Sequence, residues 1–404
     1  MLKGGFTVDA SGSAQLYFES NNTSVDIWVD SISLQPFTEK QWMSHQDQAI
    51  EKTRKTKVRI QAVDSQGKPL SNAKISIKLK KASFPFGCAI NKNILYNNAY
   101  QNWFTSRFTV TVFEDEMKWY STEPSQGKVD YSVPDAMLQF AKKNNVLVRG
   151  HNVFWDDPKY QQGWINSLSP TDLSKATTDR INSIMSRYRG EVIGWDVVNE
   201  NLHFNFFESK LGQNASAVFY NLAQKIDGTS TLFLNEYNTI ENARDGDSTP
   251  AKYLQKLRIL RHFLVMEIEI GIGLESHFSS AAPNLAYMRA SIDTLAATNF
   301  PIWLTEVDVQ RGPYQASLQL EGTILGADSK GGTQSPESGR NCDLVSLETA
   351  GMLQMCLTDN NFKNLPTGNV VDELWLGGLL SSPRLAGQME MASSRRPFPM
   401  DFTV

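Results

Sequence analysis

The sequence lacks the features that mark several other protein classes. Only three of its 404 residues are cysteine, and they form neither a Cys-x-x-Cys pair nor a Cys/His cluster, which excludes a disulfide scaffold and a structural zinc site. With 39 Lys and Arg against 43 Asp and Glu, the chain has no overall positive field to hold nucleic acid or an anionic membrane. Its apolar runs are shorter than the roughly 18 residues of a membrane span. We therefore expect a globular protein without a nucleic-acid or membrane partner.

The N-terminal region has a strand-like pattern. The first residues show neither the basic nor the apolar stretch of a secretory leader, so no signal peptide is expected in this chain. Residues 6–35 alternate between apolar and polar side chains, which predicts two or three strands. A polar stretch, 39–57, reads as a linker, and two further alternating runs flank Gly67 and Pro69 in a hairpin pattern. A small β-rich module is thus expected before the main domain.

From residue 84 the pattern changes to buried strands alternating with helical stretches. Seven strand-like segments recur roughly every 36 residues, and helical segments such as 136–144 and 173–187 lie between them. The strands are expected to begin at Phe86, Arg107, Val146, Val192, Thr231, Gly271 and Pro301. A doubly wound sheet shares this alternation, but it usually has a Gly-rich phosphate turn after the first strand, and none is found here. The pattern favours an α/β protein with a TIM (β/α)8 barrel.

Chemically active side chains follow the predicted strands, where such barrels place their active sites. They are Glu114, His151, Trp155, Asn199, Glu200, Glu236, Tyr237, Glu275, His277, Glu306 and Asp308. Two carboxylates across one barrel mouth can cleave a glycosidic bond, and Glu200 and Glu306 are the natural pair. Each residue taken alone also has a structural interpretation, as a salt bridge, a hydrogen-bonded histidine or a core tryptophan. Metal binding by His151, His277 and the carboxylates stays open, although no HxH or HExxH spacing supports it.

Several motifs now carry a resemblance to a known family. The motifs are WDVVNE at 195–200, WLTEVDV at 303–309, RGHNVFW at 149–155, EMKW at 116–119 and GLESHF at 273–278. Together they resemble glycoside hydrolase family 10, above all its plant endo-β-1,4-xylanases, and residues 1–37 resemble the last part of their N-terminal carbohydrate-binding module. The similarity extends to about residue 320 and resumes over 355–375. It implies a (β/α)8 barrel over 84–375, preceded by a linker and hairpin module over 38–83.

The resemblance also implies roles for individual residues in a retaining double displacement on xylan. Glu200 would be the general acid/base and Glu306 the nucleophile, with carboxyl groups about 5 to 5.5 Å apart and the pKa of Glu200 raised by the charge of Glu306. Asn199 would hold the sugar 2-hydroxyl, and His277 would orient Glu306 with Asp308 as its partner. The remaining substrate-binding positions are Glu114, Lys118, His151, Trp155, Tyr237 and Glu275. No metal or cofactor is implied.

Two of these positions depart from the family pattern. Asp115 stands where the family usually has Asn, which places a second acid beside Glu114 and is expected to weaken the second sugar site. Glu275 replaces the Gln of microbial members, although the plant branch has the same residue.

The C-terminal third departs much further. Residues 315–361 contain no Phe, Tyr or Trp, although five would be expected at the chain's aromatic content of 10%. Residues 316–354 and the tail 376–404 are therefore aberrant, and a proper eighth strand is not expected. Read one nucleotide later with synonymous codons, 325–349 can encode WELIQREVHSHPRVEGIVIWSAWKP, which is family-like. Similar shifts restore family-like strings in 384–402 and 261–267. We infer small insertions or deletions in the encoding DNA, or a mis-spliced or misannotated gene, with a genuine diverged loop as the alternative.

The frameshift inference leaves more than one function open. The motifs predict an endo-1,4-β-xylanase acting on xylan or another β-1,4-linked polysaccharide in the extracellular space or cell wall. The damaged C-terminal third also allows a catalytically impaired xylan-binding homologue or a nonfunctional product. A specificity for cellulose is a weaker alternative.

Overall fold

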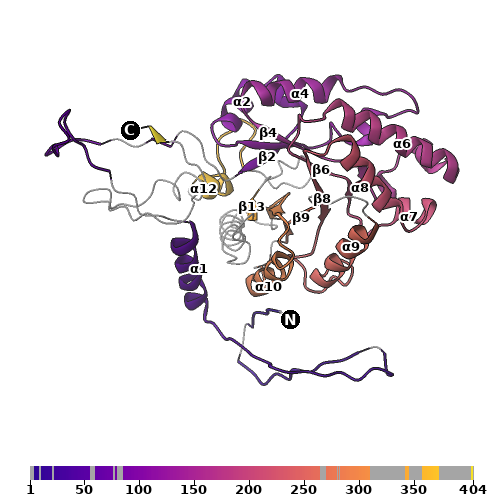
Figure 1. Cartoon of the computed structure of the whole chain (residues 1–404), viewed down its shortest axis with the longest axis horizontal. Coiled ribbons are helices and arrows are strands. Elements are labelled where there is room, and N and C mark those ends of the chain that lie inside the picture. Colours follow the sequence, from indigo (N-terminus) through magenta and orange to yellow (C-terminus); the bar gives the residue numbers. More distant parts are fainter. Residues whose placement is uncertain are drawn as a thin grey trace.

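The computed structural model describes residues 4–8, 11–20, 22–54, 60–75, 78–79, 85–263, 270–279, 281, 283–309, 342–344, 357–372 and 402–403. Within these ranges the centre of the molecule is a curved parallel sheet that runs in chain order from its first strand to its last (Figure 1). Its eight strands are β2 (Gly87–Ile90), β3 (Val110–Phe113), β4 (Leu147–Gly150), β6 (Gly194–Asp196), β8 (Thr231–Glu236), β9 (Ile270–Leu274), β11 (Ile302–Leu304) and β13 (Cys342–Leu344).

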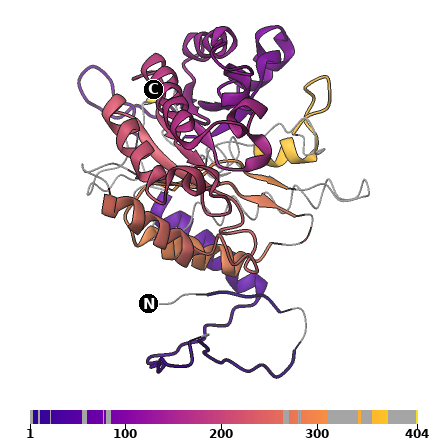
Figure 2. The same cartoon turned by 90° about the vertical axis from the view of Figure 1, so that its right-hand side faces the viewer.

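Helices surround the sheet on its outer side (Figures 1 and 2). They are α2 (Asn98–Thr105), α3 (Trp119–Thr122), α4 (Ser132–Lys143), α5 (Gly163–Asn166), α6 (Pro170–Arg187), α7 (Phe206–Leu211), α8 (Ala215–Ile226), α9 (Pro250–Phe263), α10 (Leu285–Ala296) and α12 (Pro366–Asp372), with the short turns η1 (Lys92–Leu95) and η2 (Pro158–Tyr160). Local sequence sets their starts. Ser169 caps α6 by accepting a hydrogen bond from the Asp172 N–H, and Pro170 occupies the first helical turn.

Short strand pairs extend the sheet toward the carboxyl ends of its strands. β5 (Phe154–Trp155) pairs in parallel with β7 (Val198–Asn199), and β10 (His277–Phe278) pairs in parallel with β12 (Asp308–Val309). The pairs bring the segments that follow β4, β6, β9 and β11 together. All seven strands expected from the sequence lie where the pattern placed them, and the TIM-barrel interpretation is confirmed as a curled parallel sheet with outer helices.

The sheet is open at one seam among the described residues. The three-residue β13 occupies the eighth position and pairs with β11, whereas the described part of β2 pairs with β3 alone. Residues 357–372 nevertheless return to the first βα unit. The side chains of Arg107 and Asp372 form an ion pair with an Nε–Oδ1 distance of 2.8 Å, and the ring of Phe362 stacks on Tyr100. Residues 357–372 therefore pack against the first βα unit, next to α2.

The N-terminal region differs from its sequence prediction. No strand is found in the described residues before 78, and apolar side chains such as Leu16 and Trp28 are largely exposed. Alternation alone does not form a strand, because each strand needs a partner for its backbone groups. Figure 2 shows this region extending away from the barrel. The expected hairpin survives as a tight turn with a bridge between Val63 and Pro69, and β1 (Lys78–Leu79) pairs with β14 (Phe402–Thr403).

The expected linker at 39–57 contains the helix α1 (Glu39–Arg54) instead. Its start has a reciprocal cap, because the Thr38 N–H donates to Gln41 Oε1 at 2.8 Å and the Gln41 N–H donates to Thr38 Oγ1 at 3.3 Å. This Ser/Thr-x-x-Glu/Gln box is a helix start signal that the charge-rich composition concealed. No helix in the described ranges is long and apolar enough to cross a bilayer. The segments assigned to frameshifts, 325–349, 384–402 and 261–267, lie wholly or mostly outside the described residues.

Candidate active site

Four glutamates lie at the carboxyl ends of neighbouring strands and are tied together through the backbone. The Glu200 N–H donates to Asn235 O at 3.0 Å, the Glu275 N–H to Glu236 O at 2.9 Å, and the Glu306 N–H to Glu275 O at 3.0 Å. These bonds continue the parallel sheet past the regular strands. They fix the backbone positions of the acidic residues relative to each other, so the parallel sheet itself positions the site.

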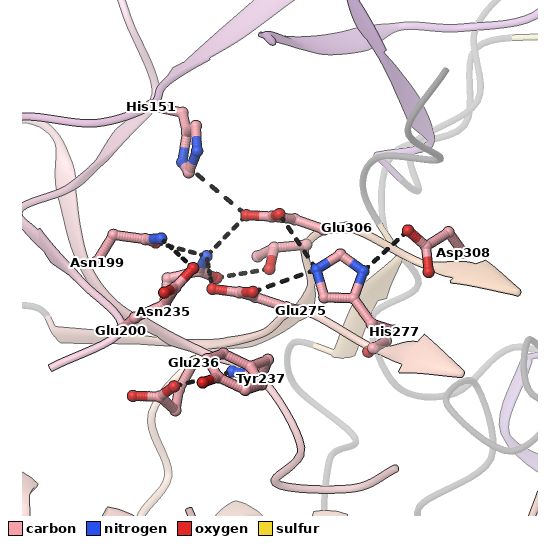
Figure 3. A network of polar contacts seen from close by, with 12 residues as sticks. His151, Asn199, Glu200, Asn235, Glu236, Tyr237, Glu275, His277, Glu306 and Asp308 are labelled. Atoms are coloured by element: carbon pink, nitrogen blue, oxygen red, sulfur yellow. Dashed lines mark hydrogen bonds and ion pairs between the residues drawn. The ribbon is translucent and has the colours of Figure 1, made fainter. Parts of the chain in front are cut away.

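The side chain of Asn235 joins the acidic residues at the centre of the site (Figure 3). Its Nδ2 lies 2.9 Å from Glu306 Oε1, 3.0 Å from Glu275 Oε1 and 2.9 Å from Asn199 Oδ1. The hydroxyl of Thr305 donates to Asn235 Oδ1 at 2.5 Å, which fixes the orientation of the amide. Asn235 is fully buried, so this donor stabilises carboxylate oxygens away from bulk water.

Glu306 is held in its charged form. Burial alone would raise its pKa, but the hydrogen bond from His277 and the positive charges of His151, His277 and Arg149 lower the pKa of Glu306 well below its ordinary value. His277 Nε2 lies 3.6 Å from Glu306 Oε2, and His151 Nδ1 lies 3.9 Å from Glu306 Oε1. Glu306 is therefore an ionised carboxylate with little water around it.

Glu200, in contrast to Glu306, is held in its neutral, protonated form. Burial, together with the negative charges of Glu236 and Glu306, raises the pKa of Glu200 to about 8. Its backbone adopts the left-handed conformation with φ of 58°, which costs a non-glycine residue roughly 1 to 2 kcal/mol. Asn199 Nδ2 donates to Glu200 Oε1 at 3.3 Å. Burial is thus the main cause of the raised pKa, and the charge of Glu306, which the sequence analysis named, contributes less.

The two carboxyl groups can therefore divide the work of a displacement reaction. At neutral pH the Glu200 carboxyl keeps its proton and the Glu306 carboxylate keeps its charge. A protonated acid beside an ionised carboxylate is the arrangement that protonates a leaving oxygen while a nucleophile attacks carbon.

Two histidines lie against Glu306 from opposite sides. His277 Nδ1 lies 2.9 Å from Asp308 Oδ2, and its Nε2 lies 3.2 Å from Glu275 Oε2. His151 Nδ1 lies 2.7 Å from Asp196 Oδ2, and Asp196 also forms a fully buried ion pair with Arg149. The positive charge near Glu306 is thus itself anchored by buried or nearly buried aspartates.

The sequence-predicted residues that follow strands β3 and β4 form a separate group. Lys118 Nζ lies 3.2 Å from Asp115 Oδ1 and 4.6 Å from the centre of the Trp155 ring. Tyr160 also stacks on Trp155, with ring centres 3.8 Å apart. Glu114 Oε2 accepts a hydrogen bond from Asn91 Nδ2 at 3.1 Å. Burial would raise the pKa of Asp115, but Lys118 and the Tyr120 hydroxyl lower it below the ordinary value.

One group of side chains could in principle hold a cation. Ligand atoms of Glu275, His277 and Glu306 lie within 4.8 Å of one another. Burial would lower the pKa of His277, but the carboxylates of Asp308, Glu275 and Glu306 raise it well above its ordinary value. A metal ligand must be the neutral imidazole, so these surroundings favour the imidazolium and oppose metal binding. The positive charge of the His277 imidazolium balances the negative charge of the neighbouring carboxylates, as a bound cation otherwise would.

Sequence reasoning did not identify Asn235, Asp196, Arg149 or His203. The strand-end rule selected Glu236, but successive residues of a strand point to opposite sides, so Asn235 faces Glu306 while Glu236 faces His203. The alternating directions of side chains along β8 were the signal in the sequence that could have identified Asn235. Asp196 is the second residue of WDVVNE and Arg149 is the first residue of RGHNVFW, so both stood within the quoted motifs. Asp196 contacts His151, and Arg149 forms an ion pair with Asp196.

Comparisons with known proteins show which sequences and folds this chain is similar to. Endo-1,4-beta-xylanase 5 of Arabidopsis thaliana is 45% identical over 376 residues, which cover 93% of this chain and 65% of that protein, so this chain spans about two thirds of its relative. The fold is similar to a xylanase 10C variant of Cellvibrio japonicus in complex with xylopentaose, with a TM-score of 0.64, 19% identity and coverage of 73% and 68%.

A second solved structure, endo-1,4-beta-xylanase XylE of Penicillium canescens, also has a TM-score of 0.64, with 20% identity and coverage of 72% of this chain and 94% of that one. These two solved structures show the fold. The family itself is shown by a sequence model of glycosyl hydrolase family 10 that matches residues 76–373. This chain therefore belongs to glycosyl hydrolase family 10.

Proposed function

We propose that this protein cleaves internal β-1,4-xylosidic bonds of xylan and retains the configuration at the anomeric carbon. The observation that supports this most is the opposite protonation preference of Glu200 and Glu306, held at the ends of the strands on either side of β8 and β9. The names of the relatives and the xylopentaose bound to the related xylanase support a xylose polymer as the substrate. Because xylan is a wall polysaccharide, we place the activity in the extracellular space or cell wall.

In the first step, the Glu306 carboxylate attacks the anomeric carbon while the Glu200 carboxyl donates its proton to the departing glycosidic oxygen. A covalent xylosyl ester forms on Glu306 and the leaving half of the chain departs with the proton. In the second step, the Glu200 carboxylate takes a proton from water, the hydroxyl adds to the anomeric carbon, and Glu306 is released. Glu200 is then protonated again for the next cycle.

The surrounding residues bind the sugar and hold the carboxylates. Asn199, which contacts both Asn235 and Glu200, holds the 2-hydroxyl of the reacting xylose. His277 orients Glu306, with Asp308 and Glu275 as its partners. The xylose units before the cut lie along Glu114, Lys118, His151 and Trp155, and Tyr237 forms a wall on the leaving-group side.

The test compares two alanine variants on two substrates. Glu306→Ala should lose the hydrolysis of both xylan and a 4-nitrophenyl xylobioside, because no covalent ester can form. Glu200→Ala should lose xylan hydrolysis but keep the first turnover of the nitrophenyl substrate, whose leaving group departs without protonation, and added azide should accelerate its turnover. Glu191→Ala serves as the control, because this glutamate pairs with Lys142 away from the site. Equal losses in both variants on both substrates would contradict the assignment of roles.

A further inference from the structure

A second group of charged residues lies beside the active site, after strands β7 and β8. His203 Nδ1 lies 2.6 Å from Glu236 Oε1, and its Nε2 lies 2.9 Å from Asp245 Oδ2. Both ring nitrogens face carboxylate oxygens, so both donate hydrogen bonds and the ring carries a positive charge. Burial would lower the pKa of His203, but Glu236 and Asp245 raise it to about 9. The reaction described above assigns no role to this imidazolium.

The charged ring of His203 is stacked on Tyr237. The two ring centres are 3.9 Å apart and the planes differ by 9°. A cation on the face of an aromatic ring is attracted by the ring quadrupole, so the contact is more than apolar packing. One face of Tyr237 is therefore covered by His203, and the plane of the phenol ring is set by the imidazolium.

The partners of His203 also fix the backbone on both sides of the stack. Glu236 accepts hydrogen bonds from the Leu202 N–H at 2.7 Å and from the Tyr237 N–H at 3.1 Å. Asp245 accepts a hydrogen bond from Asn238 Nδ2 at 2.7 Å. The segment that follows Glu200 and the segment that carries Tyr237 are thus joined through one histidine and two carboxylates. Glu236 is fully buried, so its charge depends on this partner.

In the proposed reaction, Tyr237 forms a wall on the leaving-group side, where Glu200 donates its proton. Burial, together with the charges of Glu200 and Glu236, raises the pKa of Tyr237. Figure 3 shows Tyr237 and Glu236 beyond Glu275 and Glu200, on the side away from His151. The proposed function places the xylose units before the cut along Lys118, so the leaving-group sugar is expected to meet Tyr237 instead.

We propose that His203 is a positioning residue for the leaving-group sugar, because it fixes the ring of Tyr237 against which that sugar packs. This inference rests on the proposed function, in which Glu200 protonates the leaving oxygen. It predicts that His203 matters only for substrates that have a sugar after the cut. A substrate that releases fluoride has no such sugar and needs no proton from Glu200.

The experiment compares xylohexaose with β-xylobiosyl fluoride in the full chain. His203→Asn and His203→Gln should each lower kcat/KM for xylohexaose by about tenfold or more, because a small misplacement of the binding surface weakens the productive pose. The value of kcat/KM for the fluoride should stay within about twofold of the unchanged chain. His262→Asn is the matched control, because His262 is an exposed histidine on α9, and it should change neither value. Two His203 variants are used so that poor folding of one does not decide the outcome.

A double-mutant cycle with Tyr237→Ala adds a second readout. If His203 acts through Tyr237, the loss for xylohexaose in the double variant should be smaller than the product of the two single losses. Equal losses on xylohexaose and the fluoride, no loss on either, or independent effects of the two residues would each overturn the inference while leaving the proposed function in place. An unchanged chain that cleaves neither substrate would overturn the proposed function itself, and this inference with it.

Discussion

Gly273 lies directly opposite Asn235 in the parallel pair formed by β8 and β9, and a Cβ atom at position 273 would lie 2.3 Å from Asn235 Oδ1. No real Cβ atom approaches another heavy atom so closely. The side chain that joins Glu306, Glu275 and Asn199 therefore has its place because its neighbour has no side chain. The position of the Asn235 amide therefore depends on the absence of a side chain at Gly273.

We expect Gly273→Ala to reduce activity on xylan strongly while the protein stays folded. The added methyl group must displace Asn235, and overpacking of this kind typically costs about 1 to 3 kcal/mol of stability. The displaced amide no longer donates to Glu306, so kcat should fall by about tenfold or more. The measurement is the initial rate on xylan together with a thermal melt. Gly163→Ala is the control, because a Cβ atom there meets nothing within 4 Å. An unchanged kcat in Gly273→Ala would contradict the role of Asn235.

The pKa of Glu200 sets a limit on the alkaline side of the activity profile. Proton donation needs the neutral carboxyl, and the folded protein raises the pKa of Glu200 to about 8. The value of kcat/KM on xylan should therefore be constant at neutral pH and fall about tenfold for each pH unit above the pKa of Glu200. The pKa of Glu306 is lowered, so the acidic limit should lie below the ordinary 4.5 of a glutamate. A pH series from 3 to 10 with xylan tests both limits.

The first turnover of Glu200→Ala on 4-nitrophenyl xylobioside provides the matching control. With the acid removed, the rate of this step should no longer fall above pH 8. A fall that persists in this variant would assign the alkaline limit to a different group.

The sequence predicted the architecture of the barrel better than the connections inside the site. Seven buried strands could be found because each is an apolar run that ends in polar residues, as β9 does before Glu275. The rule that active residues follow strand ends then found Glu200 and Glu306. It did not find Asn235, because this residue lies inside β8 and its importance comes from three neighbours on other strands.

In the N-terminal region, a clear sequence pattern predicted strands that the structure does not contain in the described residues. The alternation around Trp28 is typical of a strand, yet Trp28 is 92% exposed and no strand is formed in the described residues there. Strand pairing is a long-range property, whereas the capping box at Thr38 and Gln41 is local and does start a helix. Local signals were the more dependable guide in this part of the chain.

Removing one partner of the buried ion pair behind His151 should lower stability far more than removing one partner of an exposed pair. Arg149 and Asp196 have no exposed side-chain area, and Asp196 also contacts His151 at 2.7 Å. Asp196→Asn removes the carboxylate paired with the buried guanidinium of Arg149, so the free energy of unfolding should fall by about 3 to 5 kcal/mol. Urea unfolding followed by tryptophan fluorescence measures this change.

The exposed pair of Arg187 and Asp135 is the matched control, because its two side chains are 45% and 28% exposed. Asp135→Asn should cost less than about 1 kcal/mol. Similar costs for the two aspartates would show that the Arg149 charge is stabilised by other groups.

The open seam of the sheet leads to a prediction about the C-terminal third. Among the described residues, β13 pairs with β11 and β2 pairs with β3, which leaves one edge of β13 and one edge of β2 unpaired.

Replacing residues 325–349 with WELIQREVHSHPRVEGIVIWSAWKP, the string obtained from the shifted reading frame, supplies the apolar run GIVIW in place of a segment without aromatic residues. A strand of this kind can pair with both β11 and β2, bury both edges and complete the barrel. We therefore expect the midpoint of thermal unfolding to rise by about 4 °C or more, and the rate of xylan hydrolysis to rise above that of the unchanged chain. A chain that carries the same 25 residues in scrambled order has the same composition and should gain neither property. An equal gain from the scrambled segment would show that hydrophobic content is enough, and no gain from the replacement would show that residues 325–349 are not the defect that the sequence indicates.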